Sequence, residues 1–320
     1  MASESKTAIY AALLGNLAIA VTKIIAASIT GSSAMLSEAI HSIVDTGNEI
    51  LLLLGLHLSK RKADIEHPYG HGRELYFWSL IVALGIFAIG GGLSLYEGIS
   101  HIRHPEPMTD PFWNYVVLGF AFVFESISLV FGWRAFSRKK GRQGIIEAMH
   151  TSKDPTTFIV TFEDSAAILG LLIAAGGVYF GHTLNNPYFD GVASMVIGLM
   201  LSLMAAFLAY ETKGLLIGEG YPPQTLRQLR ELIATDKGVE RVNRVLTMFL
   251  GPEEVMLTVE LRFRRELSAE EVRTAISRVK DLVRDTYPEI KRIYFAAESL
   301  CDDDRQKEEE IEHSSTAIGL

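Results

Sequence analysis

Long apolar stretches separated by short polar connections fill the first two thirds of the chain. A bilayer core about 30 Å thick needs roughly 20 mostly apolar residues in a helix, and six stretches meet this requirement. They lie at about 8–28, 33–58, 76–100, 113–136, 155–181 and 187–210. The pattern predicts an α-helical membrane domain of six transmembrane helices over residues 1–212, embedded in the lipid bilayer.

The pattern changes from about Pro222, because amphipathic helical segments then alternate with short strand-like runs. We predict helices at 224–235 and 268–286 and strands near 239–249, 254–263 and 291–297. Ser268 followed by Glu271 is a capping-box signal for the second of these helices. The order αββαβ predicts a small α+β ferredoxin-like domain over 222–300, and the acidic run 301–320 predicts a disordered tail.

The amino-acid composition limits the class of protein and the residue types that could bind a metal. Apolar residues make up 48% of the chain and the mean hydropathy is +0.22, which argues against a soluble protein. A lone Cys301 excludes an intramolecular disulfide framework and a thiolate metal cluster, so any metal ligands must be His, Asp or Glu. Much of the net charge of −8 lies in the tail, and nothing in the sequence predicts nucleic-acid binding.

Basic residues gather in two of the short connections, after the second and the fourth predicted helix. They are Lys60, Arg61, Lys62, Arg73, Arg138, Lys139, Lys140, Arg142 and Lys153. The alternate connections carry almost none, with Arg103 as the exception. Since cytoplasmic loops are enriched in Lys and Arg, we expect both termini on the cytoplasmic side. We also expect no cleaved presequence and a prokaryotic inner (plasma) membrane.

The second predicted helix carries polar residues every three to four positions, namely Glu38, His41, Asp45 and then Asn48 or Glu49. Such residues line one helical face and are costly in lipid unless they are paired or face a cavity. His41 and Asp45 are one turn apart, so their ligand atoms can converge on one zinc ion at about 2 Å. The alternative is a polar seam that hydrogen-bonds neighbouring helices.

The fifth predicted helix carries Glu163 and Asp164 ahead of a long apolar run. Adjacent helical residues point about 100° apart, so we expect one carboxylate to have a different role from the other. The buried charges Lys23 and Glu125 could pair with each other or reach towards an interface; we expect a structural role for Lys23, while the role of Glu125 stays open. The small residues of GIFAIGGG in the third helix predict close helix packing.

Three motifs resemble the cation diffusion facilitator family, and the resemblance covers nearly the whole chain. They are GSSAMLSEAIHSIVDTGNE (31–49), HPYGHGRELYFW (67–78) and YFDGVASMVIGLML (188–201). The run SKDPTTFIVTFEDSAAILG and the Glu125 helix further resemble the branch that contains mitochondrial zinc transporter 9. The resemblance implies a homodimeric metal-ion/proton antiporter, not an enzyme, with a cytoplasmic ferredoxin-like domain.

The resemblance also implies a transport site made of two HxxxD-type pairs. His41 and Asp45 match the first pair and Asp164 matches the last residue of the second, but Val160 stands where the family has His. Three metal ligands therefore align. Candidates for the fourth ligand are water, Thr161, Glu163 and Glu38, and the two glutamates are also candidate proton carriers.

A second, peripheral metal site in the family's first cytoplasmic loop corresponds to Asp64, His67 and His71. The alternative is a turn in which the imidazoles hydrogen-bond the backbone. The family positions that bridge two soluble domains through zinc hold Asn243, Glu260 and Phe295 here. We therefore expect no bridging metal in that domain.

The expected function is export of a divalent cation from the cytoplasm in exchange for protons, with no permanent cofactor. His41 favours Zn²⁺ as the transported ion, whereas the loss of an imidazole at Val160 keeps Mn²⁺ and Fe²⁺ open. One rival is a membrane metal sensor or scaffold without turnover. Another is an intramembrane metallohydrolase, which the lack of an HExxH-like pair disfavours.

Overall fold

The computed structural model describes residues 2–105, 112–140 and 155–297. The chain divides into two compact units at Glu219 and Gly220, except that the short segment Phe249–Pro252 groups with the first unit. The predicted tail 301–320 lies outside the described residues, as do Arg142 and Lys153.

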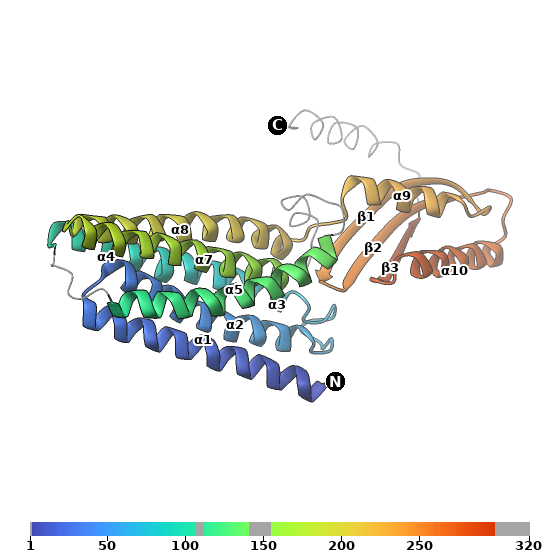
Figure 1. Cartoon of the computed structure of the whole chain (residues 1–320). Helices are drawn as coiled ribbons and strands as arrows, with labels where there is room; N and C mark the ends of the chain where they lie inside the picture. The colour runs from blue at the N-terminus through green and yellow to red at the C-terminus, as the bar shows by residue number, and fades with distance from the viewer. Residues whose placement is uncertain (1, 106–111, 141–154, 298–320) are drawn as a thin grey trace, which may run out of the picture. The chain divides into compact units, whose positions relative to one another are not determined.

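The N-terminal unit is a bundle of long helices that run side by side (Figure 1). In chain order they are α1 (Ala2–Thr30), α2 (Ser33–Ser59), α3 (Glu74–Gly85), η1 (Ile86–Gly91), α4 (Gly92–Arg103), α5 (Phe112–Lys140), α7 (Pro155–Thr183) and α8 (Tyr188–Ile217). Five spans, counting Glu74–Arg103 as one, are long and apolar enough to cross a membrane, and Asn16–Thr30 in α1 is a shorter apolar stretch. The helical membrane domain is thus confirmed, while a sixth span at α1 stays a prediction.

The turn between α1 and α2 follows from its sequence. Gly31 adopts a φ of +67°, a left-handed conformation that glycine reaches without a Cβ clash and that commonly ends a helix. Ser32 then caps α2 by accepting a hydrogen bond from the Met35 N–H at 3.1 Å. The buried carboxylate of Asp190 on α8 accepts from the Ser33 N–H and the Ser32 hydroxyl, which fixes the first turn of α2 to α8.

α2 packs against α1, α3, α7 and α8, so its polar face lies inside the bundle. The third span packs on α8 through glycines, as the small-residue run predicted: a Cβ at Gly91 would lie only 3.1 Å from the Gly198 carbonyl oxygen of α8. This span is not one regular α-helix. It passes through the π-helical segment η1, which the hydrophobic pattern did not predict.

The C-terminal unit contains α9 (Pro223–Ala234), β1 (Val239–Gly251), β2 (Glu254–Phe263), α10 (Ala269–Thr286) and β3 (Ile290–Ala297). The sheet has the order β1-β2-β3, and β3 runs parallel to β2. Alternate residues of β2 are buried, as expected for a strand with one covered face. The capping box of Ser268 and Glu271 is present at the start of α10. The predicted αββαβ order is therefore confirmed (Figure 1).

Candidate functional site

A cavity inside the N-terminal unit lies among α1, α2, α5 and α7. It is lined by Asn16, Ser42, Asp45, Glu49, Glu125, Val160, Glu163 and Asp164. Five of these eight side chains are carboxylic acids. Such a concentration of oxygen ligands at membrane depth is a functional feature by default, because it is costly without cations or protons to balance it.

α2 contributes the predicted pair. The His41 ring is buried, with 1% exposed, and its Nδ1 lies 3.3 Å from Asp45 Oδ1, so the one-turn spacing does bring the two groups together. Asp45 lines the cavity, while His41 is not among the lining residues. Neither ring nitrogen of His41 has a hydrogen-bond partner among the described residues. Buried imidazole nitrogens without partners are costly, and they are suited to a ligand role.

α7 contributes Asp164 and Glu163, which both line the cavity. Ser128 on α5 donates a hydrogen bond to Asp164 Oδ2 at 2.9 Å, and Asn48 on α2 donates to Glu163 Oε1 at 2.7 Å. The two adjacent carboxylates therefore have different hydrogen-bond partners. Val160 lies one turn before Asp164 and also lines the cavity.

Sharing a cavity does not make the predicted ligands a closed metal site. Within the described residues, the group of three or more His, Cys, Asp and Glu side chains whose ligand atoms all lie within 4.8 Å of one another is Asp64, His67 and His71. His41, Asp45 and Asp164 do not form such a group. To bind one ion together, their ligand atoms must come closer to one another than they are in this structure.

Glu38, a candidate fourth ligand, does not line the cavity. It is fully buried, and its Oε2 accepts a hydrogen bond from the Lys23 ammonium at 3.1 Å. Lys23 also donates to Ser42 Oγ at 2.8 Å, and Glu125 Oε1 lies 4.0 Å from the ammonium. The sequence marked Lys23 and Glu125 as possible partners, but it did not predict that Glu38 is the nearer one.

The sequence-based reasoning also missed three polar residues that hold charged groups in place: Asn16 and Ser128, which donate to carboxylates, and Ser42, which accepts from the Lys23 ammonium. Asn16 donates to Glu49 Oε1 at 2.7 Å. A usable signal existed for two of them: Ser42 lies four residues after Glu38, and Ser128 lies three residues after Glu125, each pair on one helical face. Asn16 carries no such signal, because its role depends on how α1 packs against α2.

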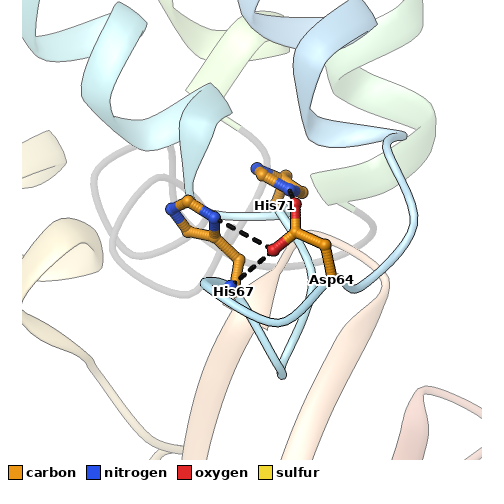
Figure 2. Close-up of side chains that lie close together, drawn as sticks. All are labelled: Asp64, His67 and His71. Carbon is orange, nitrogen blue, oxygen red and sulfur yellow. Dashed lines mark hydrogen bonds and ion pairs between the residues drawn. The ribbon is translucent and has the colours of Figure 1, made fainter.

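The connection after α2 brings Asp64, His67 and His71 together (Figure 2). Asp64 Oδ1 accepts from the His67 backbone N–H at 2.6 Å, and Asp64 Oδ2 lies 3.0 Å from His71 Nε2. These hydrogen bonds lower the pKa of Asp64 to about 2, so the carboxylate is charged at neutral pH. Gly70, with a φ of +85°, permits the tight turn between the two imidazoles.

The loop is a hydrogen-bonded turn, but its bonds run to the Asp64 carboxylate, from the His67 backbone N–H and the His71 ring, whereas the alternative has the imidazoles bonding to the backbone. The ligand atoms of the three side chains also lie close enough to share a metal ion. We refer to Asp64, His67 and His71 as the loop cluster.

Comparison with known proteins gives matches over most of the chain. The proton-coupled zinc antiporter SLC30A9, mitochondrial, from Xenopus laevis is 36% identical over 243 residues, which are 75% of this chain and 44% of that protein. The human protein of the same name is 36% identical over 236 residues, or 73% of this chain and 42% of that one. The chain therefore spans less than half the length of these curated relatives.

A bacterial relative matches over a greater share of its length. The cation-efflux pump FieF of Escherichia coli O127:H6 is 25% identical over 285 residues, 89% of each chain. Among solved structures, the C-terminal domain of MamM in a nickel form matches 24% of this chain and 99% of its own length, with 15% identity and a TM-score of 0.22.

The family model for the cation efflux transmembrane domain matches residues 9–217, which is more than half of the chain and contains both the cavity and the loop cluster. This confirms the expected resemblance and the expectation of a multi-pass membrane transporter rather than an enzyme. The chain belongs to the cation efflux family.

Proposed function

We propose that this protein exports Zn²⁺ from the cytoplasm in exchange for protons. One observation carries the proposal: α2 and α7, far apart in sequence, direct Asp45 and Asp164 into the same carboxylate-lined cavity, with His41 beside Asp45. The 36%-identical relatives named as proton-coupled zinc antiporters support both the ion and the coupling.

The proposed transport ligands are His41, Asp45 and Asp164. Zn²⁺ accepts imidazole nitrogen and carboxylate oxygen, and it commonly takes four ligands. Water is the proposed fourth ligand, because Glu163 points about 100° away from Asp164 on the same helix and Glu38 is held outside the cavity by Lys23. Glu163 lines the cavity and is instead a proposed proton carrier. A site with one imidazole also accepts Mn²⁺ or Fe²⁺, so the proposal of Zn²⁺ needs a direct comparison of ions.

Exchange of metal ions for protons follows because both compete for the same ligand atoms. Imidazole and carboxylates bind the cation when deprotonated, so each proton that binds weakens the site, and each cation that binds displaces protons. Asp45, Glu163 and Asp164 face the cavity and are the proposed proton carriers. On this proposal, the ion enters from the less acidic side and leaves on the more acidic side.

We further propose that both termini face the cytoplasm, that the protein works as a homodimer, and that the loop cluster binds a second metal ion. The basic loops support the orientation, and the 4.8 Å grouping of ligand atoms supports the loop site. The identity of the membrane and the lack of a bridging metal at Asn243, Glu260 and Phe295 stay predictions from the sequence.

The test is metal flux into proteoliposomes under an imposed pH gradient, for the native chain, Asp45→Asn and Asp164→Asn. Glu49→Gln is the matched control, because Glu49 lines the same cavity but is not a proposed ligand. We expect gradient-driven Zn²⁺ uptake in the native chain and the control, and a loss of more than about 100-fold in both aspartate variants. Repeating the assay with Mn²⁺ and Fe²⁺ ranks the ions.

One outcome would favour the second candidate, a membrane metal sensor or scaffold. The observation in its favour is that Val160 replaces a family ligand. Native protein that binds Zn²⁺ through Asp45 but shows no flux at any pH gradient would contradict the transport proposal and support the sensor.

A further inference from the structure

Lys23 is a buried cation that the proposed mechanism does not use. Its side chain has 0% exposed surface, and its ammonium donates to Glu38 Oε2 and Ser42 Oγ. A buried ammonium with a carboxylate partner is stable only while that partner is kept, since removing one member leaves an uncompensated charge.

The ammonium also lies close to the cavity. Ser42, one of its acceptors, lines the cavity, and Glu125, whose Oε1 is 4.0 Å from Nζ, lines it as well. Glu38, in contrast, is not a lining residue. Lys23 thus lies between an anchoring carboxylate behind the cavity wall and a second carboxylate on the wall.

The protein provides space for the anchoring carboxylate. Glu38 Oε1 has no hydrogen-bond partner among the described residues and lies against Gly170 of α7, where a Cβ would collide with it. Any larger residue at position 170 would therefore displace the group that holds the ammonium. Lys23 of α1, Glu38 of α2 and Gly170 of α7 therefore form one cluster of contacts.

We propose that Lys23 is an affinity-determining residue of the transport site: a tethered cation that Glu38 holds back from the cavity and that otherwise pairs with Glu125. Released towards Glu125, the ammonium removes a carboxylate from the cavity and repels the divalent cation by its charge. Held by Glu38 at 3.1 Å, the ammonium stays 4.0 Å from Glu125, which still lines the cavity. This inference rests on the proposed function, because it concerns the same site.

An affinity-determining role for Lys23 and a purely structural role predict different effects of substitutions on metal binding. If the Lys23–Glu38 pair only braces the helices, removing either member or both weakens metal binding alike. If Lys23 is a tethered competitor, removing Glu38 alone weakens binding, while removing Lys23 as well restores it. The double variant separates the two explanations, since it removes both members of the Lys23–Glu38 pair at once.

The experiment measures Zn²⁺ affinity of the full-length protein in detergent, by competition with a fluorescent chelator, in an Asp64→Ala background that removes the loop cluster. We expect Glu38→Gln to weaken binding about tenfold, from one charge acting on a divalent ion at intermediate dielectric. Lys23→Met/Glu38→Gln should bind as the native chain does or more tightly, and Lys23→Arg, which keeps the charge, should resemble the native chain. Size-exclusion profiles and thermal unfolding establish that each variant is folded.

Gly170→Ala repeats the test without altering a charge, because it displaces Glu38 by contact alone, and it should also weaken binding. Equal, weak binding by Glu38→Gln and the double variant would overturn the inference, as would native affinity in both Glu38→Gln and Gly170→Ala. Failure of the proposed function looks different: Zn²⁺ binding by the native chain would then not depend on Asp45.

Discussion

The cavity and the loop cluster use the same ligand types under opposite conditions. In the loop cluster, three ligands from eight consecutive residues lie within 4.8 Å of one another, and Asp64 and His67 are about half exposed. In the cavity, the proposed ligands come from α2 and α7 and are not so close. The loop cluster is held by hydrogen bonds within its own turn, whereas the cavity is held by helix packing.

This difference determines whether the metal affinity of each site can change during transport. A cluster fixed by local hydrogen bonds keeps its geometry whatever the helices do, which suits stable binding. A site divided between two helices changes its geometry whenever those helices move, so its affinity can alternate between high and low. Only the second property allows an ion to be taken up on one side of a membrane and released on the other.

The largest expected effect comes from completing the cavity site. Val160→His places an imidazole one turn before Asp164, on a side chain that already lines the cavity. A fourth protein ligand should tighten Zn²⁺ binding by about 100-fold, which competition with a fluorescent chelator would measure. Flux should fall at the same time, because release becomes slower.

Val160→Leu is the control for Val160→His, since it changes the volume at this position without adding a ligand. Unchanged affinity in the histidine variant would mean that α7 does not present this position to the ion. It would remove the main argument for assigning Asp164 to the same site.

A smaller effect should come from the residues that orient the carboxylates. Ser128→Ala removes the hydrogen bond to Asp164 Oδ2 and leaves the carboxylate freer to turn away from the ion. We expect Zn²⁺ affinity to fall about tenfold, as is usual when an outer partner of a ligand is lost. Ser165→Ala is a matched control, because that hydroxyl donates to the Thr161 carbonyl oxygen of its own helix. An equal loss in both variants would point to a general defect in α7.

The sequence predicted the elements well because their signals are local. Six apolar stretches, the αββαβ order and the Ser268 capping box depend on periodicity and on residues a few positions apart, and the structure has the predicted elements at these places. The π-helical segment η1 was missed, since its glycines and apolar residues fit a regular helix equally well. Its form depends on packing against α8.

The candidate site was predictable only where its contacts join residues that are close in the sequence. The His41–Asp45 contact follows from i,i+4 spacing, and the loop cluster follows from residues of one turn. That Glu38 pairs with Lys23 rather than joining the cavity does not follow from any local pattern, because it depends on the rotation of α1 against α2. For buried charges, the sequence identified the participants but not the pairing.

The comparison predicts that the loop cluster has little effect on flux. Asp64→Ala and His71→Ala each remove a ligand of the cluster, so stoichiometric Zn²⁺ binding should fall by one ion per chain for either variant. Proton-driven flux should change by less than about threefold, because the cavity ligands are untouched. Equilibrium dialysis and proteoliposome flux measure the two quantities separately. A loss of flux as large as that of Asp45→Asn would show that the ion must pass through the loop cluster.

The smallest expected effect is the pH dependence of the turn that holds the loop cluster. Hydrogen bonds from the His67 N–H and from His71 lower the pKa of Asp64 from its ordinary value of 3.8 to about 2. The ionised carboxylate therefore stabilises the turn above that ordinary value, and this contribution is lost only as the pH falls through about 2. Hydrogen exchange at the His67 amide, corrected for intrinsic rates, should keep the same protection from about pH 7 to about pH 4. Asp64→Asn should reduce that protection at every pH in the range, because the amide accepts more weakly than a carboxylate.

Protection in the native chain that disappears well above pH 4 would mean that the turn is held by something other than Asp64, and the contrast between a locally fixed cluster and a helix-dependent cavity would lose its basis.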